Sequence, residues 1–111
     1  MDNIKNRELI RTLLDCAAAC EDCATACLHE EDVKQMSECI ALDRDCADIC
    51  ALAARLLQRD SGIAAKFLAV CGDMCRRCKE ECSRHGHHDH CLRCAEACCR
   101  CAEACQAAAN G

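Results

Sequence analysis

The chain has 111 residues, of which 17 are cysteine and one, Phe67, is aromatic, and its formal net charge is −5 at pH 7. An acidic chain without a basic stripe argues against nucleic-acid binding, and an odd number of cysteines argues against a complete disulfide framework. Because proline is absent and alanine is frequent, we expect long, uninterrupted helices rather than strands.

The N-terminal segment carries a charged residue every few positions through residue 11, and no stretch is long and apolar enough for a signal sequence or a membrane span. We therefore expect no membrane association and a cytoplasmic protein, in a compartment that keeps thiols reduced. No set of residues typical of an active site occurs, so we do not expect an enzyme.

Periodicity and turn signals predict an all-α protein. We expect helices at about residues 3–30, 32–59, 61–84 and 88–109, within one domain that spans residues 1–111. Asp32 and Gln35 have the spacing of a capping box, Ser61 is a candidate N-cap, and Gly86 suits a left-handed residue after a helix. Short connections force neighbouring helices to be antiparallel, which predicts an up-down-up-down four-helix bundle.

The cysteines fall into four groups, one on each expected helix. The groups are Cys16, Cys20, Cys23 and Cys27; Cys39, Cys46 and Cys50, with Asp43 in the remaining position; Cys71, Cys75, Cys78 and Cys82; and Cys91, Cys94, Cys98, Cys101 and Cys105. Steps of three and four residues keep each group on one face of a helix. We expect these faces to line the core of the bundle.

The second half of the chain repeats the first. One constant offset places Cys16 on Cys71 and Cys39 on Cys94, and it aligns the other members of these groups as well. Agreement at so many positions indicates that the bundle is a duplicated helical hairpin.

The topology predicts two different ends. One end collects His29, Met36, His85, His87, His88 and His90, which are soft or borderline metal donors. We interpret these residues as secondary metal ligands or as a route for metal uptake, with a solvated polar loop as the alternative. The other end collects an apolar plug of Leu9, Leu13, Leu14, Leu56, Leu57, Ile63, Phe67 and Leu68.

Thiols at this density indicate binding of several soft metal ions. Thiolates select Cu(I), Zn(II) and iron–sulfur clusters. Replacing thiol protons with Cu(I) leaves the buried charge almost unchanged, whereas Zn(II) in a four-thiolate site leaves about −2 per ion in an apolar core. Iron–sulfur motifs wrap a cluster with loop spacings instead of lining helices. We favour multiple Cu(I) ions; a ferredoxin-like iron–sulfur protein and a zinc-binding protein are the alternatives.

The segments CAAACEDCATAC, CIALDRDCADIC, CGDMCRRCKEEC and CLRCAEACCRCAEAC, which extend from Cys16 to Cys105, resemble the cytosolic branch of the bacterial copper storage proteins. The resemblance implies high-capacity Cu(I) storage and buffering by core cysteines, uptake at a histidine-bearing end, and assembly into a homotetramer. A cytosolic copper chaperone is a candidate partner.

Two positions depart from the regular pattern. Asp43 occupies a cysteine position, where its carboxylate is a candidate ligand or hydrogen-bond partner; the alternative is a polar residue that is merely tolerated beside metal. Cys99 follows Cys98 directly and therefore points about 100° away from the stripe, so it reaches the core only from its edge or lies at a helix–helix seam.

Overall fold

Four long helices make up the part of the chain that the computed structural model describes, residues 3–110. They are α1 (Asn3–Cys27), α2 (Ser37–Gln58), α3 (Ala64–Ser83) and α4 (Asp89–Asn110), with a short 3-10 helix, η1 (Val33–Met36), before α2. Without proline, nothing removes a backbone donor inside them.

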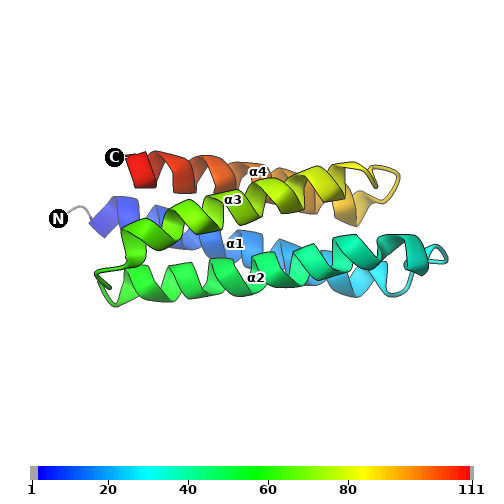
Figure 1. The fold of residues 1–111 in the computed structure, drawn as a ribbon, viewed down its shortest axis with the longest axis horizontal. Coiled ribbons are helices and arrows are strands. Elements are labelled where there is room, and N and C mark those ends of the chain that lie inside the picture. The colour runs from blue at the N-terminus through cyan, green and yellow to red at the C-terminus, as the bar shows by residue number, and fades with distance from the viewer. Residues whose placement is uncertain (1–2, 111) are drawn as a thin grey trace.

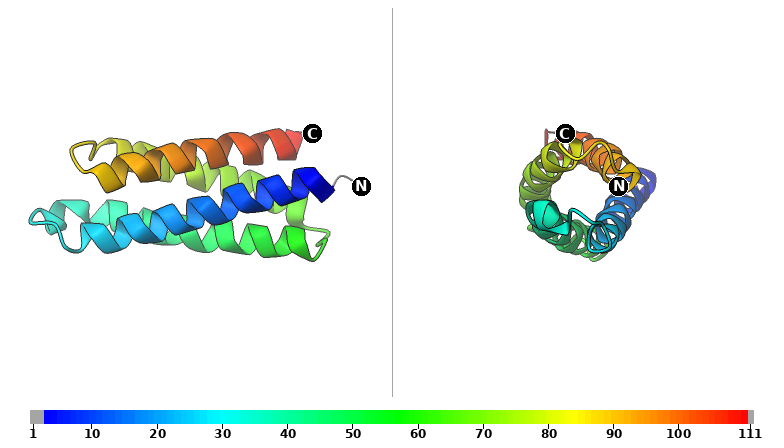
Figure 2. Two further views of the ribbon diagram at one scale, coloured as in Figure 1. Left: turned by 180° about the vertical axis from the view of Figure 1, so that it is seen from behind. Right: turned by 90° about the vertical axis from the view of Figure 1, so that its right-hand side faces the viewer.

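The helices form an antiparallel bundle that measures 49 × 19 × 19 Å. Around the bundle, α1 packs against α2 and α4, while α3 packs against the same two helices (Figure 1). Viewed along the axis, the four helices surround a common centre (Figure 2). The predicted up-down-up-down four-helix bundle is confirmed.

The connections separate the two ends of the bundle. The α1–α2 and α3–α4 connections lie together at one end, whereas the α2–α3 connection and both chain ends lie at the other (Figure 1). All five histidines are in or beside the α1–α2 and α3–α4 connections. Within residues 3–110, none of the helices combines the length and apolar character that crossing a membrane would require.

The connection after α1 differs from the prediction. The helix ends at Cys27 rather than near residue 30, because His29 and Glu30 donate to carbonyls three residues back, at 3.0 and 3.2 Å, and so tighten the last turn. The expected capping box is also wrong. Asp32 makes no side-chain cap; its carboxylate instead faces two histidines of the other hairpin, and the chain from Val33 to Met36 forms η1.

The connection between α2 and α3 contains a residue in the left-handed conformation, Asp60. Asp60 has φ 52°, the N–H of Ser61 donates to the carbonyl of Leu56 at 2.9 Å, and the N–H of Asp60 donates to that of Leu57 at 3.2 Å. This is a Schellman motif, in which a left-handed aspartate is tolerated. The prediction for α3 is partly correct: the helix begins at Ala64 rather than near residue 61, with Ile63 at its N-cap, while Ser61 Oγ accepts a hydrogen bond from the N–H of Ile63 at 3.4 Å in the turn before it.

The connection between α3 and α4 needs no left-handed residue, so the prediction for Gly86 is wrong. Gly86 does not have a positive φ. Instead α3, which ends at Ser83, closes through a three-residue turn in which the N–H of His85 donates to the carbonyl of Cys82 at 3.0 Å. The N–H of His88 repeats this pattern with the carbonyl of His85, and α4 then begins at Asp89.

The predicted apolar plug is partly correct. Leu13, Leu68 and Leu56 are buried at the end opposite the histidines, and Phe67 packs partly against the core. Leu14, on the exposed side of α1, and Ile63, in the connection before α3, do not belong to the plug, because they are 46% and 58% exposed. The buried leucines close this end of the core with apolar side chains.

Candidate metal centre

A column of thiols fills the centre of the bundle. Sixteen cysteines, all except Cys99, have no exposed surface, and among the described residues all seventeen cysteines are free thiols. Small residues such as Ala47, Ala53 and Ala102 are buried beside them. The helical period therefore delivers the predicted stripes to one continuous core, with each helix contributing one wall.

Next to the plug, Cys50 is a meeting point of three helices. Its Sγ atom lies 3.7 Å from that of Cys71, 3.6 Å from that of Cys75 and 3.9 Å from that of Cys101. All four sulfur atoms lie within 4.8 Å of one another, close enough to surround one metal ion.

Neighbouring groups of four share members. Cys50 and Cys75 also belong to a group with Cys16 and Cys46, and those two join Cys20 and Cys98 in the next group along the axis. A thiolate that belongs to two groups can bridge two metal ions. The column can therefore hold a connected chain of ions, which is an arrangement suited to low-coordinate soft metals.

Asp43 lies inside the column, as its place in the stripe predicts. Its Oδ1 atom accepts hydrogen bonds from the thiols of Cys78 at 3.2 Å, Cys94 at 3.3 Å and Cys82 at 3.4 Å. Desolvation, reinforced by the neighbouring Cys94 and Cys78, raises the pKa of Asp43 to about 11. In the metal-free protein this carboxyl group is therefore protonated at neutral pH.

His90 closes the thiol column at the end near the hairpin connections, which we call the mouth. Its Nδ1 atom lies 3.6 Å from the sulfur atoms of Cys23 and Cys91 and 3.8 Å from that of Cys27. Its Nε2 atom lies 2.8 Å from Glu30 Oε2. A hydrogen bond from Nε2 leaves the Nδ1 lone pair directed at the three thiols, the arrangement of a carboxylate-oriented metal-binding histidine.

Burial favours the protonated form of two thiols at the mouth, Cys27 and Cys91. Desolvation, assisted by the charge of Cys39, raises the pKa of Cys27 to about 12, and the same causes raise the pKa of Cys91. Because a metal binds the thiolate, each thiolate–metal bond formed here releases a proton, and metal affinity rises with pH.

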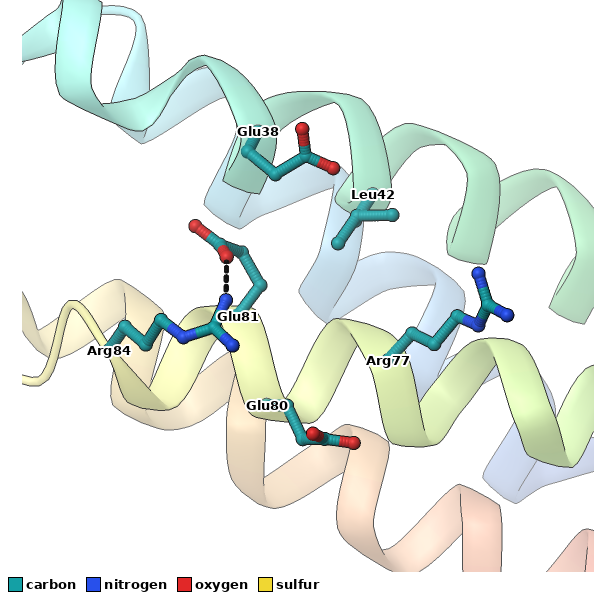
Figure 3. A pocket seen from close by; sticks show the side chains of 6 residues that line it. All are labelled: Glu38, Leu42, Arg77, Glu80, Glu81 and Arg84. Atoms are coloured by element: carbon teal, nitrogen blue, oxygen red, sulfur yellow. Dashed lines mark hydrogen bonds and ion pairs between the residues drawn. The ribbon is translucent and has the colours of Figure 1, made fainter.

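The other histidines occupy different surroundings. His85 Nε2 lies 2.8 Å from the carboxylate of Glu81, which also binds Arg84 at 2.6 Å. Figure 3 shows the pair of Glu81 and Arg84 in a surface groove between α2 and α3. This groove is lined by Glu38, Leu42, Arg77, Glu80, Glu81 and Arg84. The carboxylate of Glu81 thus holds the ring of His85.

His87 and His88 face Asp32 across the mouth, at 3.4 and 3.2 Å from its carboxylate oxygens. Although desolvation acts in the opposite direction, hydrogen bonds from His87 and His88 keep the pKa of Asp32 below its usual value. His29 is exposed and does not belong to the chain of adjacent rings that runs from His85 through His87 and His88 to His90.

Two further predicted residues, Met36 and Cys99, differ in how deeply they are buried. Met36 has no exposed surface and packs into the core from η1. Cys99 is half-buried, which agrees with its offset from the stripe.

Three carboxylates at the mouth were not predicted as part of the site: Glu30, Glu81 and Asp32, which was predicted only as a helix cap. Glu81 precedes His85 by four residues on one helix, so that pair could have been found from spacing. The partners of Glu30 and Asp32 lie on the other hairpin, and no local pattern connects them.

Comparison with known proteins agrees with this geometry. The model of a family described as copper storage protein matches residues 2–110. The chain belongs to the copper storage protein family. A cytosolic copper storage protein from Streptomyces lividans, solved with five coppers, is 42% identical, with a TM-score of 0.95 and coverage of 99% of this chain and 96% of that one.

Two further proteins are similar to this chain. The Cu(I)-bound copper storage protein BsCsp3 of Bacillus subtilis is 46% identical, with a TM-score of 0.90 and coverage of 95% of this chain and 98% of that one. An uncharacterized cysteine-rich protein, YhjQ of Bacillus subtilis, is 48% identical over 88 residues, which are 79% of this chain and 81% of the relative. These matches favour copper over the iron–sulfur and zinc alternatives.

Proposed function

We propose that this member of the copper storage protein family holds many Cu(I) ions in its core and so stores and buffers copper. The observation that carries the proposal is the column of sixteen fully buried thiols, in which neighbouring groups of four share members. Shared thiolates bridge adjacent ions, so capacity approaches one ion per core cysteine. The family supports a storage role rather than a catalytic one.

Charge favours Cu(I) as the stored ion. Each Cu(I) that replaces a thiol proton leaves the net charge of the core unchanged, so filling the column does not accumulate buried charge. Zn(II) in four-thiolate sites would leave about −2 per site, at a cost of several kcal/mol per uncompensated buried ion. The copper in two of the matched structures supports the same choice.

We assign the main ligands to the sixteen buried cysteines. They are Cys16, Cys20, Cys23, Cys27, Cys39, Cys46, Cys50, Cys71, Cys75, Cys78, Cys82, Cys91, Cys94, Cys98, Cys101 and Cys105. Asp43 adds an oxygen donor midway along the column, and His90 adds a nitrogen donor at the mouth. We propose that Met36, His29, His85, His87 and His88 assist uptake, and that Cys99 serves as a marginal ligand at most.

The direct test is an anaerobic titration of the reduced, metal-free protein with Cu(I). Because the chain has no Trp or Tyr, the near-ultraviolet bands of thiolate–Cu(I) bonds can be followed without interference. We expect a linear rise to more than ten ions per chain, on the scale of one ion per buried thiol. Saturation at one or two ions would contradict storage, and displacement of bound Cu(I) by Zn(II) would favour the zinc alternative.

The family also supports a cellular location, an oligomeric state and a partner for this protein. The cytosolic relative in Streptomyces lividans supports a cytoplasmic location, where the thiols stay reduced. The resemblance also supports a homotetramer, which sedimentation of the purified protein would measure. A cytosolic copper chaperone that delivers or withdraws copper would act at the mouth, where His90 meets three thiols.

A further inference from the structure

A second group of metal-binding side chains lies outside the thiol column, on the surface of the mouth. Asp32 comes from the α1–α2 connection, while His87 and His88 come from the α3–α4 connection. His88 Nε2 lies 3.2 Å from Asp32 Oδ1 and 3.4 Å from Oδ2, and His87 Nε2 lies 3.4 Å from Oδ2. The rings of His87 and His88 are adjacent, with centroids 4.0 Å apart.

These separations suit a single divalent ion. A tetrahedral metal that binds nitrogen and oxygen at about 2.0–2.1 Å places its ligand atoms about 3.3–3.4 Å apart. The nitrogen–oxygen distances of 3.2 and 3.4 Å match that spacing. Two histidines, one carboxylate and a water molecule are a common donor set for Zn(II). None of the three side chains offers sulfur, the donor that Cu(I) prefers.

The contacts of His88 are compatible with a cation at this position. Its Nδ1 atom lies 3.2 Å from Glu30 Oε2, while its Nε2 atom faces Asp32. A neutral imidazole has only one N–H, so it donates a hydrogen bond to only one of these carboxylates. Both carboxylates are satisfied either by a doubly protonated ring, which donates from both nitrogens, or by a metal ion bound between Nε2 and Asp32. With the metal ion bound, Glu30 orients the ring through Nδ1.

We propose that Asp32, His87 and His88 bind one borderline divalent cation, Zn(II), in a site separate from the thiol column. The ion joins the two hairpin connections, because Asp32 belongs to one and both histidines belong to the other. His90 shares the Glu30 carboxylate with His88, and its Nδ1 atom lies beside the outermost thiols. An ion in the new site therefore fixes the connections beside the mouth and slows copper exchange.

The site is tested with Co(II) as a visible probe for Zn(II), on protein whose thiols have first been saturated with Cu(I). The copper content, measured beforehand, tests storage; a low value is a failure of the proposed function, not of this site. On the saturated protein we expect one equivalent of Co(II) to bind, with visible d–d bands of a four- or five-coordinate ion and no thiolate-to-Co(II) charge-transfer bands. Added Zn(II) displaces the Co(II).

Matched variants locate the bound ion. Asp32→Asn removes a ligand and Glu31→Gln is its control, because Glu31 is an exposed acid at the preceding position of the same connection. We expect Asp32→Asn and the double variant His87→Ala, His88→Ala to weaken Co(II) binding by more than about 100-fold, and Glu31→Gln to bind as the parent protein does. Absence of stoichiometric binding, or binding that survives both site variants, would overturn the proposal.

The effect on copper exchange rests on the proposed storage function and has its own measurement. The rate at which a Cu(I) chelator withdraws copper from the loaded protein is compared with and without one equivalent of Zn(II). We expect Zn(II) to slow withdrawal several-fold in the parent protein and in Glu31→Gln, and to have no effect in Asp32→Asn. An equal rate with and without Zn(II) in the parent protein would overturn the closing role of the ion.

Discussion

The Sγ atom of Cys78, on α3, lies 3.2 Å from the Oδ1 atom of Asp43, on α2, in the middle of the thiol column. Asp43 has no exposed surface, and the same oxygen accepts hydrogen bonds from Cys82 and Cys94. A single carboxyl oxygen thus connects thiols of two other helices. Because this oxygen lies within 3.4 Å of three thiols, it can share an ion with them, which supports Asp43 as a ligand.

Replacing Asp43 with Asn tests the protonation of this group in the metal-free protein. The pKa of Asp43 is raised in the folded state to about 11, from 3.8. Between these values the unfolded chain loses the proton and the folded chain keeps it, so stability falls as pH rises, by at most about 1.4 kcal/mol per pH unit. Asn does not titrate and has no such pH dependence. We therefore expect the free energy of unfolding of Asp43→Asn, relative to that of the parent protein, to increase as pH rises from 5 to 8.

Denaturant unfolding of both reduced, metal-free proteins at several pH values measures this difference. The free energy of unfolding of the parent protein should decline more steeply with pH than that of the variant. Parallel curves would contradict a protonated Asp43 in the native core.

Replacing Asp43 with Cys tests the capacity of the column. The substitution completes the stripe of Cys39, Cys46 and Cys50 and adds a seventeenth thiol to the core. In the anaerobic titration we expect the variant to bind about one more Cu(I) per chain at saturation than the parent protein does, because capacity follows the number of bridging thiolates. Ser37→Cys, which places the added thiol at an exposed position of α2, is the control and should add no chelator-resistant ion. Identical capacities of the two variants would contradict the prediction.

Replacing His90 with Ala tests the mouth. The variant loses the nitrogen atom that faces Cys23, Cys27 and Cys91, so we expect slower loading and the loss of the most weakly held ion, with the rest of the capacity retained. Stopped-flow mixing with Cu(I) measures the loading rate. His29→Ala should have a smaller effect, because His29 is exposed and lies outside the chain of rings.

Combining the substitutions His85→Ala, His87→Ala, His88→Ala and His90→Ala should slow uptake or release further and leave total capacity nearly intact. If the variant loads copper at the same rate as the parent protein, these histidines belong to a solvated polar loop and have no role in uptake.

The sequence predicts the core of this protein better than its ends. Spacing alone assigns Asp43 and the sixteen cysteines to the core, because a helix places residues three and four apart on one face whatever surrounds it. The connections depend on contacts between hairpins. Asp32 was expected to cap a helix, yet its carboxylate faces His87 and His88, more than fifty residues away in the chain. The left-handed residue is Asp60 and not Gly86, because only the turn after α2 requires one.

Truncating the plug tests whether stability and storage reside in different parts of the bundle. Leu13 has no exposed surface, so we expect Leu13→Ala to leave a cavity and lower the free energy of unfolding by about 2–5 kcal/mol. Leu14 is 46% exposed, and Leu14→Ala should change it by about 0.5 kcal/mol or less. Neither leucine offers a metal donor, so both variants should bind as much Cu(I) as the parent protein. A Leu13→Ala variant of unchanged stability, measured by denaturant unfolding without metal, would show that the plug does not hold this end of the bundle together.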